Sequence, residues 1–148
     1  MFKHFLVPTD GSDLAKKGLE TAIELARQTQ ARITVLHVQE PASSGEVEAE
    51  LHSIGAVMSD QRISKTALLS QHYLNEALKV CRDAGLECAS DSLLNHSPAE
   101  AIAEAAQIHA CDLIVIASHG RTGLSRLMLG SQTQKLLSIT ALPVLVVR

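Results

Sequence analysis

Short apolar runs alternate along this chain with segments of helical periodicity, and no other feature restricts the fold as strongly. The runs extend from His4 to Pro8, from Arg32 to Val38, from Leu113 to Ala117 and from Pro143 to Val147, with a weaker one from Leu86 to Leu93. Several are apolar throughout, which is typical of parallel strands covered on both faces. The alternation predicts an α/β fold: a parallel sheet with helices on both faces and right-handed crossovers.

Helix signals occupy the segments between these runs. Small and apolar residues from Ala15 to Ala26 recur on one helical face, and Ser12 precedes them as the expected N-cap. A second helical pattern is expected to end near Gly85, where a glycine can adopt the left-handed conformation. A third begins with Ser97-Pro98-Ala99-Glu100, which reads as a capping box with proline at the first helical position.

The rest of the chain is a last helix and one long connection. The helix is expected to begin at Gly130 or Ser131 and to end near Ile139. The connection from Pro41 to Gln61 is largely polar, and the sequence does not decide between a flap and an ordinary loop. Because domains cluster near ~100–150 residues, we expect residues 1–148 to form a single domain.

The composition limits the partners and the location. A net charge of −3 and the absence of Trp argue against nucleic acid, whose binding surfaces are basic and often aromatic. No apolar run reaches the ~18–20 residues that cross a bilayer, and the N-terminus lacks a secretory signal. We therefore expect no membrane partner and a cytoplasmic location. Cys81, Cys88 and Cys111 have no C-x-x-C spacing, and they read as small buried residues in a reducing compartment.

Charge is distributed unevenly along the chain. No Asp or Glu follows Asp112, whereas four basic residues do, namely Arg121, Arg126, Lys135 and Arg148. Chance, together with a buried strand, would explain this asymmetry. The functional interpretation is a site for an anion of phosphate size.

Two loops are placed to bind such an anion. One is Pro8-Thr9-Asp10-Gly11-Ser12 after the first strand, and the other runs from Ala117 to Thr133 after the fourth. In open parallel sheets the ligand crevice lies at the carboxyl ends of the strands. Glycines let the backbone approach a phosphate, and a helix N-terminus offers it N–H groups and a partial positive charge. Further donors on the second loop are Ser131, Thr133, His119, Arg121 and Arg126.

Several familiar nucleotide-binding and hydrolase motifs are absent from the sequence. The chain lacks the Walker A spacing, a G-x-G-x-x-G after the first strand and the G-x-S-x-G elbow of hydrolases. Its seven histidines are scattered, so we expect no metal held by protein ligands alone. Asp10 or His119 could orient a water molecule, but neither has an obvious orienting partner, and we assign no catalytic residue.

The residues resemble the universal stress protein family. The similarity lies in Val7-Pro8-Thr9-Asp10-Gly11-Ser12, Leu36-His37-Val38, Pro98-Ala99-Glu100-Ala101-Ile102, Asp112-Leu113-Ile114-Val115 and Ser118-His119-Gly120-Arg121-Thr122-Gly123-Leu124. It covers nearly the whole chain in order, except the connection from Pro41 to Gln61. The resemblance implies a Rossmann-like open sheet of five parallel strands in the order 3-2-1-4-5, with both loops at its switch point.

The family's ATP-binding branch carries G-x-x-G, nine residues, then G-[S/T]. Gly120, Gly130 and Ser131 fit this pattern, and Ala117 replaces its first glycine. The resemblance implies that Asp10 and the backbone near Val38 hold adenine or ribose, and that the second loop holds phosphates carrying Mg²⁺ or Mn²⁺. The implied nucleotide-binding residues are Pro8, Thr9, Asp10, Val38, Ala117, His119, Gly120, Arg121, Gly130, Ser131, Gln132 and Thr133.

Ala117 is the one departure from this motif, and its effect on nucleotide binding depends on the backbone conformation at that position. If the position needs a positive φ or contact with the ribose, a methyl group costs on the order of 1–3 kcal/mol. If its backbone is ordinary β-strand, the cost is near zero. We expect binding to be retained, since alanine is the smallest departure from glycine.

The implied strand order places the last run, from Pro143 to Val147, at an edge of the sheet. An exposed apolar edge invites pairing, and the resemblance implies a homodimer formed through it. The alternative is that loops of the same chain shield this edge.

The sequence is compatible with three functions. The first is an ATP-binding homodimeric signalling module of the stress response. The second is a dimeric interaction module of the same fold that binds no nucleotide, and the third is a slow ATPase.

Overall fold

The computed structural model describes residues 1–41, 44–55, 65–120 and 129–148. Its strands are β1 (His4–Pro8), β2 (Arg32–Gln39), β3 (Ala89–Leu94), β4 (Leu113–Ala117) and β5 (Val144–Val147). Its helices are α1 (Asp13–Thr29), α2 (Ser44–Ser53), α3 (Lys65–Asp83), α4 (Pro98–Ile108) and α5 (Ser131–Ile139). Within these ranges, no helix is long and apolar enough to span a bilayer.

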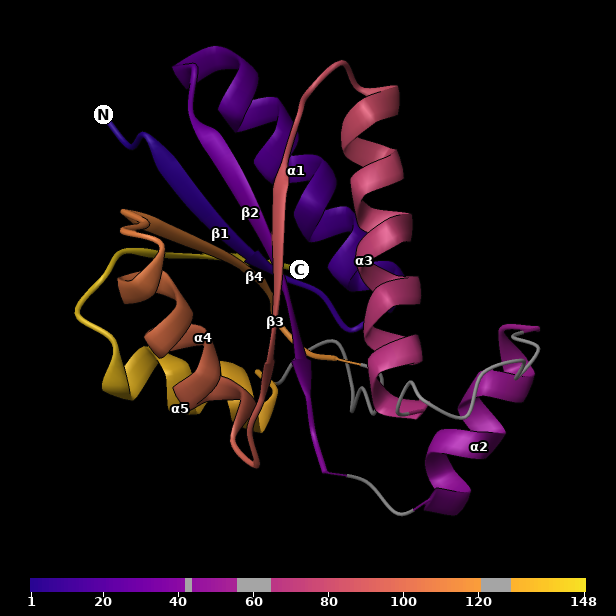
Figure 1. Cartoon of the computed structure of the whole chain (residues 1–148). Helices are drawn as coiled ribbons and strands as arrows, with labels where there is room; N and C mark the ends of the chain where they lie inside the picture. Colours follow the sequence, from indigo (N-terminus) through magenta and orange to yellow (C-terminus); the bar gives the residue numbers. More distant parts are fainter. Residues whose placement is uncertain (42–43, 56–64, 121–128) are drawn as a thin grey trace.

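The five strands form one open sheet in the order β3-β2-β1-β4-β5, and all four pairings are parallel (Figure 1). This confirms the expected fold and strand order. β1 lies at the centre, and the order reverses there, because β2 lies on one side of β1 and β4 on the other. The carboxyl ends of β1 and β4 therefore diverge into loops that lead to opposite faces of the sheet.

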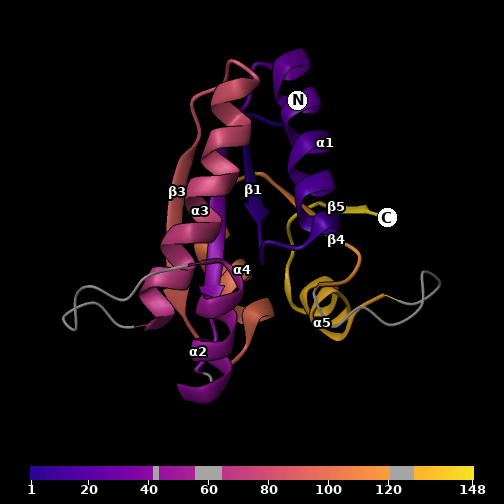
Figure 2. The same ribbon diagram turned by 90° about the vertical axis from the view of Figure 1, so that its right-hand side faces the viewer.

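Helices cover both faces: α1 and α3 lie on one, and α4 and α5 on the other (Figures 1 and 2). Alternate residues of each central strand enter different cores, because side chains alternate across a strand. Phe5 and Val7 pack with α1 and α3, whereas Leu6 packs with α4 and α5. The apolar strands thus follow from burial on both sides, where each fully buried Leu, Val or Phe contributes ~1.5–3 kcal/mol.

Two of the predicted caps are present. Ser12 Oγ accepts a hydrogen bond from the N–H of Ala15 at 3.1 Å, which caps α1. Gly85 has φ +76° just after α3, and the N–H of Leu86 donates to the carbonyl of Cys81 at 2.9 Å. This pattern is a Schellman motif. It also corrects the start of β3, which begins at Ala89 and not at Leu86, because the turn occupies the preceding residues.

The predicted capping box of α4 is wrong. Ser97 makes no side-chain cap; instead, Gln132 Oε1 accepts a hydrogen bond from the Ala99 N–H at 3.0 Å. Lys135 Nζ lies 2.9 Å from Ser97 Oγ and 2.8 Å from Glu100 Oε1. Both groups of the expected box are therefore engaged by α5, which packs beside the start of α4.

The connection from Pro41 to Gln61 contains a helix, α2, that the sequence did not reveal. Val47 and Leu51 form one apolar stripe on it and pack against Leu69 and Tyr73 of α3. This cluster is separate from the two cores of the sheet. The short stripe explains why the sequence pattern was too weak to predict a helix. The last helix, by contrast, has the predicted bounds, with Gly130 as its N-cap.

Candidate functional site

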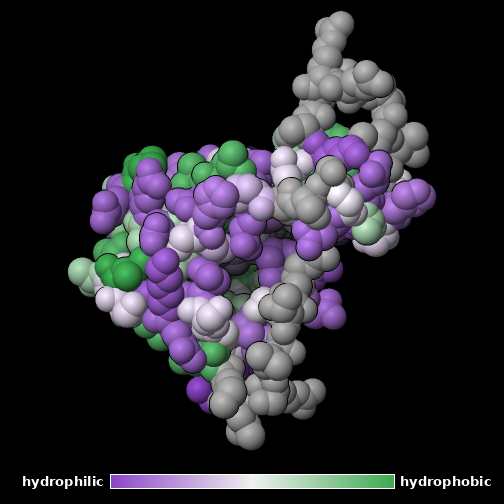
Figure 3. Space-filling view, turned by 90° about the horizontal axis from the view of Figure 1, so that it is seen from below, coloured by the Kyte–Doolittle hydropathy of each residue, from purple (hydrophilic) through white to green (hydrophobic). Residues whose placement is uncertain are grey.

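A cleft of about 1220 Å³ opens at the carboxyl ends of β1, β2 and β4. Figure 3 views this end of the molecule and shows a hollow bordered mainly by hydrophilic residues. α2 and α3 contribute to one side of the cleft, and the start of α5 contributes to the other. Ligand pockets for small molecules usually measure roughly 300–1,000 Å³, so a nucleotide fits in this space.

The cleft brings the predicted site residues together from three strand ends and the start of α5. Those lining it are Pro8, Thr9, Asp10, Val38, Ala117, His119, Gly120, Gly130, Ser131, Gln132 and Thr133. Arg121, the remaining predicted residue, lies outside the described residues, as does Arg126.

The loop after β1 is a tight turn that fixes Asp10. The Thr9 N–H donates to the carbonyl of Leu36 at 2.8 Å, which ties the loop to β2. Asp10 Oδ1 accepts the N–H of Ser12 at 3.0 Å, an Asx turn. Its other oxygen faces the second loop, since a Cβ on Gly120 would lie 2.5 Å from Asp10 Oδ2. The two loops therefore meet at a point where only glycine fits without movement of the carboxylate.

Residues 118 and 119, just after β4, contact Gly130, just before α5. The Gly130 N–H donates to the carbonyl of Ser118 at 2.7 Å, and a Cβ on Gly130 would lie 3.2 Å from His119 Cα. Thr133 Oγ1 donates to the carbonyl of Ala117 at 3.1 Å, and Thr133 is buried. Its hydroxyl therefore anchors α5 to the end of β4. The donor that Thr133 can still offer to an anion is its backbone N–H, in the first turn of α5.

The N-terminus of α5 has the properties of an anion site. The first N–H groups of a helix have no intrahelical acceptor, and Gly130 offers no side chain to cap them. The first turn contains no acidic residue. Ser131, Gln132 and Thr133 therefore present backbone donors and the positive end of the helix dipole to the cleft.

The backbone of Ala117 is ordinary β-strand. It pairs with Val147 in the parallel ladder between β4 and β5. Among the described residues, the only non-glycine positions with positive φ are Gln30 and Ala110. The methyl group at the first motif position therefore costs no backbone strain.

Sequence reasoning missed the α3 wall of the cleft. The Tyr73 ring packs against Gly11, where a Cβ would lie 2.2 Å from ring carbon Cε1, and its hydroxyl donates to Glu50 of α2. The ring centroids of Tyr73 and His37 are 5.3 Å apart, and His37 Nδ1 lies 2.9 Å from Ser70 Oγ. Tyr73 belongs to none of the motifs that mark the two loops, so no sequence signal identified it as a cleft residue.

The cleft is acidic along its α2 side. Glu40, Glu46 and Glu50 line that side, Asp10 lies where the two loops meet, and no Lys or Arg lines the cleft within the described residues. Over the same part of the chain, no three His, Cys, Asp or Glu side chains form a metal-binding group. Burial, and next the charge of Asp10, raise the pKa of Tyr73 above its ordinary value of 10.0. The α5 end is thus the side of the cleft that favours an anion.

Comparison with known proteins agrees with this architecture. A model of the Universal stress protein family matches residues 1–148. The chain is 33% identical to universal stress protein YxiE of Bacillus subtilis over 162 aligned residues, which cover all of both chains.

Solved structures share the fold. The structure of protein MJ0577, from Methanocaldococcus jannaschii, has a TM-score of 0.78 and 26% identity, covering 99% of this chain and 96% of its own. A universal stress protein in complex with cAMP has a TM-score of 0.71 at 21% identity, covering 99% and 97%. The Archaeoglobus fulgidus protein in complex with dAMP has a TM-score of 0.68 at 18% identity, covering 100% and 98%. At these last two identities, the likeness concerns the fold alone.

The strand order, the switch-point cleft and the full-length match to the family agree with one another. This chain belongs to the universal stress protein family.

Proposed function

We propose that this protein binds an adenine nucleotide in the cleft and acts as a single-domain, homodimeric signalling module of the stress response in the cytoplasm. The observation that carries the proposal is the convergence on one cleft of two loops and the N-terminus of α5, to which Gly130 gives no side-chain cap. The dAMP and cAMP complexes of structures with this fold support the choice of an adenine nucleotide.

The polarity of the cleft orients the nucleotide. Its phosphates lie against Gly120, Gly130 and the first turn of α5, where the backbone donors and the helix dipole favour negative charge. Adenine and ribose lie toward Val38, because Glu40, Glu46 and Glu50 on that side disfavour phosphate. Asp10, which lies beside Gly120, accepts a hydrogen bond from a ribose hydroxyl.

ATP is the nucleotide we propose, carrying Mg²⁺ or Mn²⁺ on its phosphates. The ion offsets phosphate charge in a cleft whose described lining contains four carboxylates and no Lys or Arg. Glu46 and Glu50 are near enough to the cleft to favour the neutralised complex over free ATP.

Calorimetric titration with Mg-ATP tests the proposal, with ATP plus a chelator and AMP as companion titrations. We expect saturable binding that is weaker when the chelator removes the divalent ion. A ligand present at ~100 times its Kd adds roughly 2.7 kcal/mol, so Tm rises by several degrees. If millimolar nucleotide produces no binding heat and no shift in Tm, this member of the family uses the fold without nucleotide.

Gly120→Ala tests whether the contact between the two loops serves binding. The added Cβ would lie 2.5 Å from Asp10 Oδ2, whose partner oxygen is held by Ser12, so the carboxylate must move. We expect Kd for Mg-ATP to rise about tenfold, or ~1.4 kcal/mol.

Gly45→Ala is the matched control, since its Cβ would meet nothing within 4 Å. We expect this variant to bind like the wild type. If Gly120→Ala also binds like the wild type, the contact between Asp10 and Gly120 has no part in binding.

A further inference from the structure

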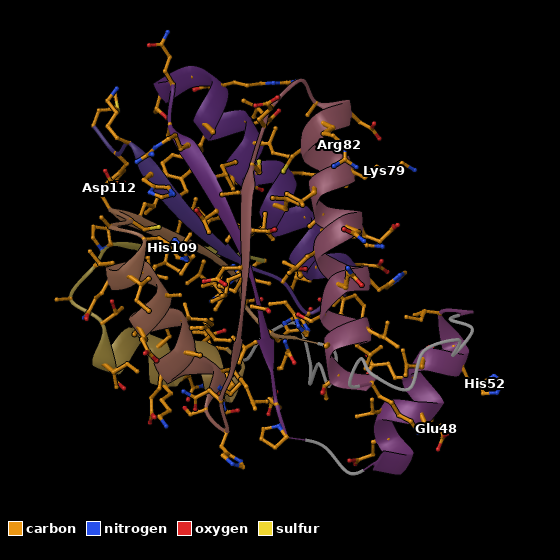
Figure 4. The ribbon with its side chains drawn as sticks, in the orientation of Figure 1. Glu48, His52, Lys79, Arg82, His109 and Asp112 are labelled. Carbon is orange, nitrogen blue, oxygen red and sulfur yellow. The ribbon has the colours of Figure 1, made fainter. Side chains whose placement is uncertain are left out.

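Two cysteines meet at the end of the molecule that lies away from the cleft. Cys81 is in the last turn of α3, and Cys88 immediately precedes β3. Figure 4 labels Arg82, the residue after Cys81, at the end of α3 opposite α2. Neither cysteine lines the cleft.

The end of α3 brings the two thiols together. The Leu86 N–H donates to the carbonyl of Cys81 at 2.9 Å, and the Gly85 N–H donates to that of Arg82 at 2.8 Å. Gly85, with φ +76°, lets the chain reverse at this point. The reversed chain carries Cys88 back against the core that contains Cys81.

The two thiols interact with each other. Cys88 packs against the core cluster that contains Cys81, and the hydrogen bonding between the two thiols lowers the pKa of Cys81 and raises that of Cys88. Cys81 is fully buried, whereas Cys88 is partly exposed and gives a small oxidant access to the pair. The third cysteine, Cys111, is also buried, and burial raises its pKa to about 11.

We propose that Cys81 and Cys88 are a modification site at which hydrogen peroxide forms an intramolecular disulfide. The site is independent of nucleotide binding. The sequence analysis interpreted these cysteines as small buried residues in a reducing compartment, but Cys88 is only partly buried and packs against the core that contains Cys81.

The reaction balances with one peroxide. The Cys81 thiol loses its proton, and the thiolate attacks a peroxide oxygen. The O–O bond breaks and hydroxide leaves, taking up that proton to form the first water, which yields a sulfenic acid on Cys81. The Cys88 sulfur then attacks the Cys81 sulfur, the S–O bond breaks, and the hydroxyl leaves as water with the Cys88 proton. In total, two thiols are oxidised to a disulfide and one peroxide is reduced to two waters. A thiol reductant reverses the link by exchange.

Oxidation of the full-length protein tests the site directly. The reduced protein is exposed to hydrogen peroxide, unfolded without reductant and alkylated with N-ethylmaleimide. We expect the wild type to lose about 2 Da on oxidation and to retain one alkylatable thiol out of its three. Digestion after Arg and Glu residues should then link peptide 77–82 to peptide 88–100, and dithiothreitol should separate them.

Two variants identify the partners. Cys111→Ser should form the same disulfide, whereas Cys88→Ser should form none and should accumulate oxygen adducts on Cys81. Because Cys88 is partly exposed, its replacement is compatible with folding, which thermal unfolding of the variant checks.

Other results would overturn the site. These are three alkylatable thiols in the wild type at an excess of peroxide, a link that includes Cys111, or links formed only between molecules. Oxygen adducts in the wild type at the same level as in Cys88→Ser would overturn it as well.

Discussion

Gly120 and Asp10 show how closely single residues define the cleft. A carboxylate oxygen occupies the volume that a side chain at position 120 would need. At Ala117 the requirement is weaker, because that residue continues β4 with ordinary strand geometry. The same motif therefore contains one position where a side chain would displace the Asp10 carboxylate and another that accepts alanine. The difference lies in neighbours that are distant in sequence.

His4 predicts a pH dependence of stability. It is buried, and its Nε2 lies 2.8 Å from Thr34 Oγ1. Burial, and next the charge of Arg32, lower the pKa of His4 below its ordinary value of 6.5. The unfolded chain therefore binds this proton first, and the free energy of unfolding falls as pH drops below about 6.5.

Denaturant unfolding over a pH series measures this effect. We expect His4→Gln to flatten the loss of stability below pH 6.5, relative to the wild type. His52→Gln, on the exposed outer side of α2, controls for the loss of one histidine (Figure 4). If the free energy of unfolding falls equally steeply below pH 6.5 in the wild type and in His4→Gln, a group other than His4 causes the acid sensitivity.

Tyr73 can be followed directly, because the chain contains one Tyr and no Trp. Burial and the charge of Asp10 raise its pKa above 10.0. We expect tyrosinate absorbance in the folded protein to appear at higher pH than in the protein unfolded by guanidinium. Stability should fall as pH rises above 10.0, because the unfolded phenol ionises first.

Asp10→Asn separates the two causes of this shift. In the folded protein, this variant should bring the titration midpoint of Tyr73 only partly back toward 10.0, since burial is the larger cause of the shift. A folded midpoint equal to the unfolded one in the wild type would contradict the buried position of the phenol.

At the level of elements, the ends of the helices depend on different kinds of partner. The caps at Ser12 and Gly85 use groups within a few residues, and the sequence predicts both. The start of α4 instead uses Gln132 from α5, so its predicted local box does not form. A long-range partner replaced a local one where two helix ends pack together.

Two glycines should respond in opposite ways to the same substitution. Gly18 lies inside α1, where a Cβ would meet its nearest atom at 3.8 Å, so Gly18→Ala should stabilise the protein by ~0.5–1 kcal/mol. Gly85 has φ +76°, so Gly85→Ala should destabilise it by ~1–2 kcal/mol.

Urea unfolding of both variants measures these changes against the wild type. Both should keep the wild-type m-value, since neither alters the area exposed on unfolding. A stabilising Gly85→Ala would mean that the left-handed turn after α3 is not formed in solution.

At the scale of the whole molecule, the two edges of the sheet differ. β3 carries polar residues such as Ser90 and Asp91, whereas β5 is apolar and, within the part of the chain that the structure describes, pairs only with β4. The carbonyls of Pro143 and Val147 accept hydrogen bonds from β4, so the alternate residues Val144 and Val146 direct their backbone groups outward. This open edge is where we propose that a second copy pairs.

Val146→Pro tests the proposed homodimer. Proline removes an outward N–H while leaving the bonds of β5 to β4 in place. Light scattering should give a dimer mass for the wild type and a monomer mass for this variant. Val146→Thr keeps the N–H and the branched shape, so it should remain dimeric. A wild type that is monomeric at high concentration, or a dimeric Val146→Pro, would place any interface elsewhere.

The residues by themselves determined the strands, most helices and the two loops at the carboxyl ends of β1 and β4. Each depends on local periodicity, or on glycine and serine acting within a few residues of the chain. Only the tertiary structure decided the helix α2, the Gln132 cap of α4 and the place of Tyr73 in the cleft wall. In each of these cases the stabilising partner lies far away in the sequence, so no short segment contains both halves of the interaction.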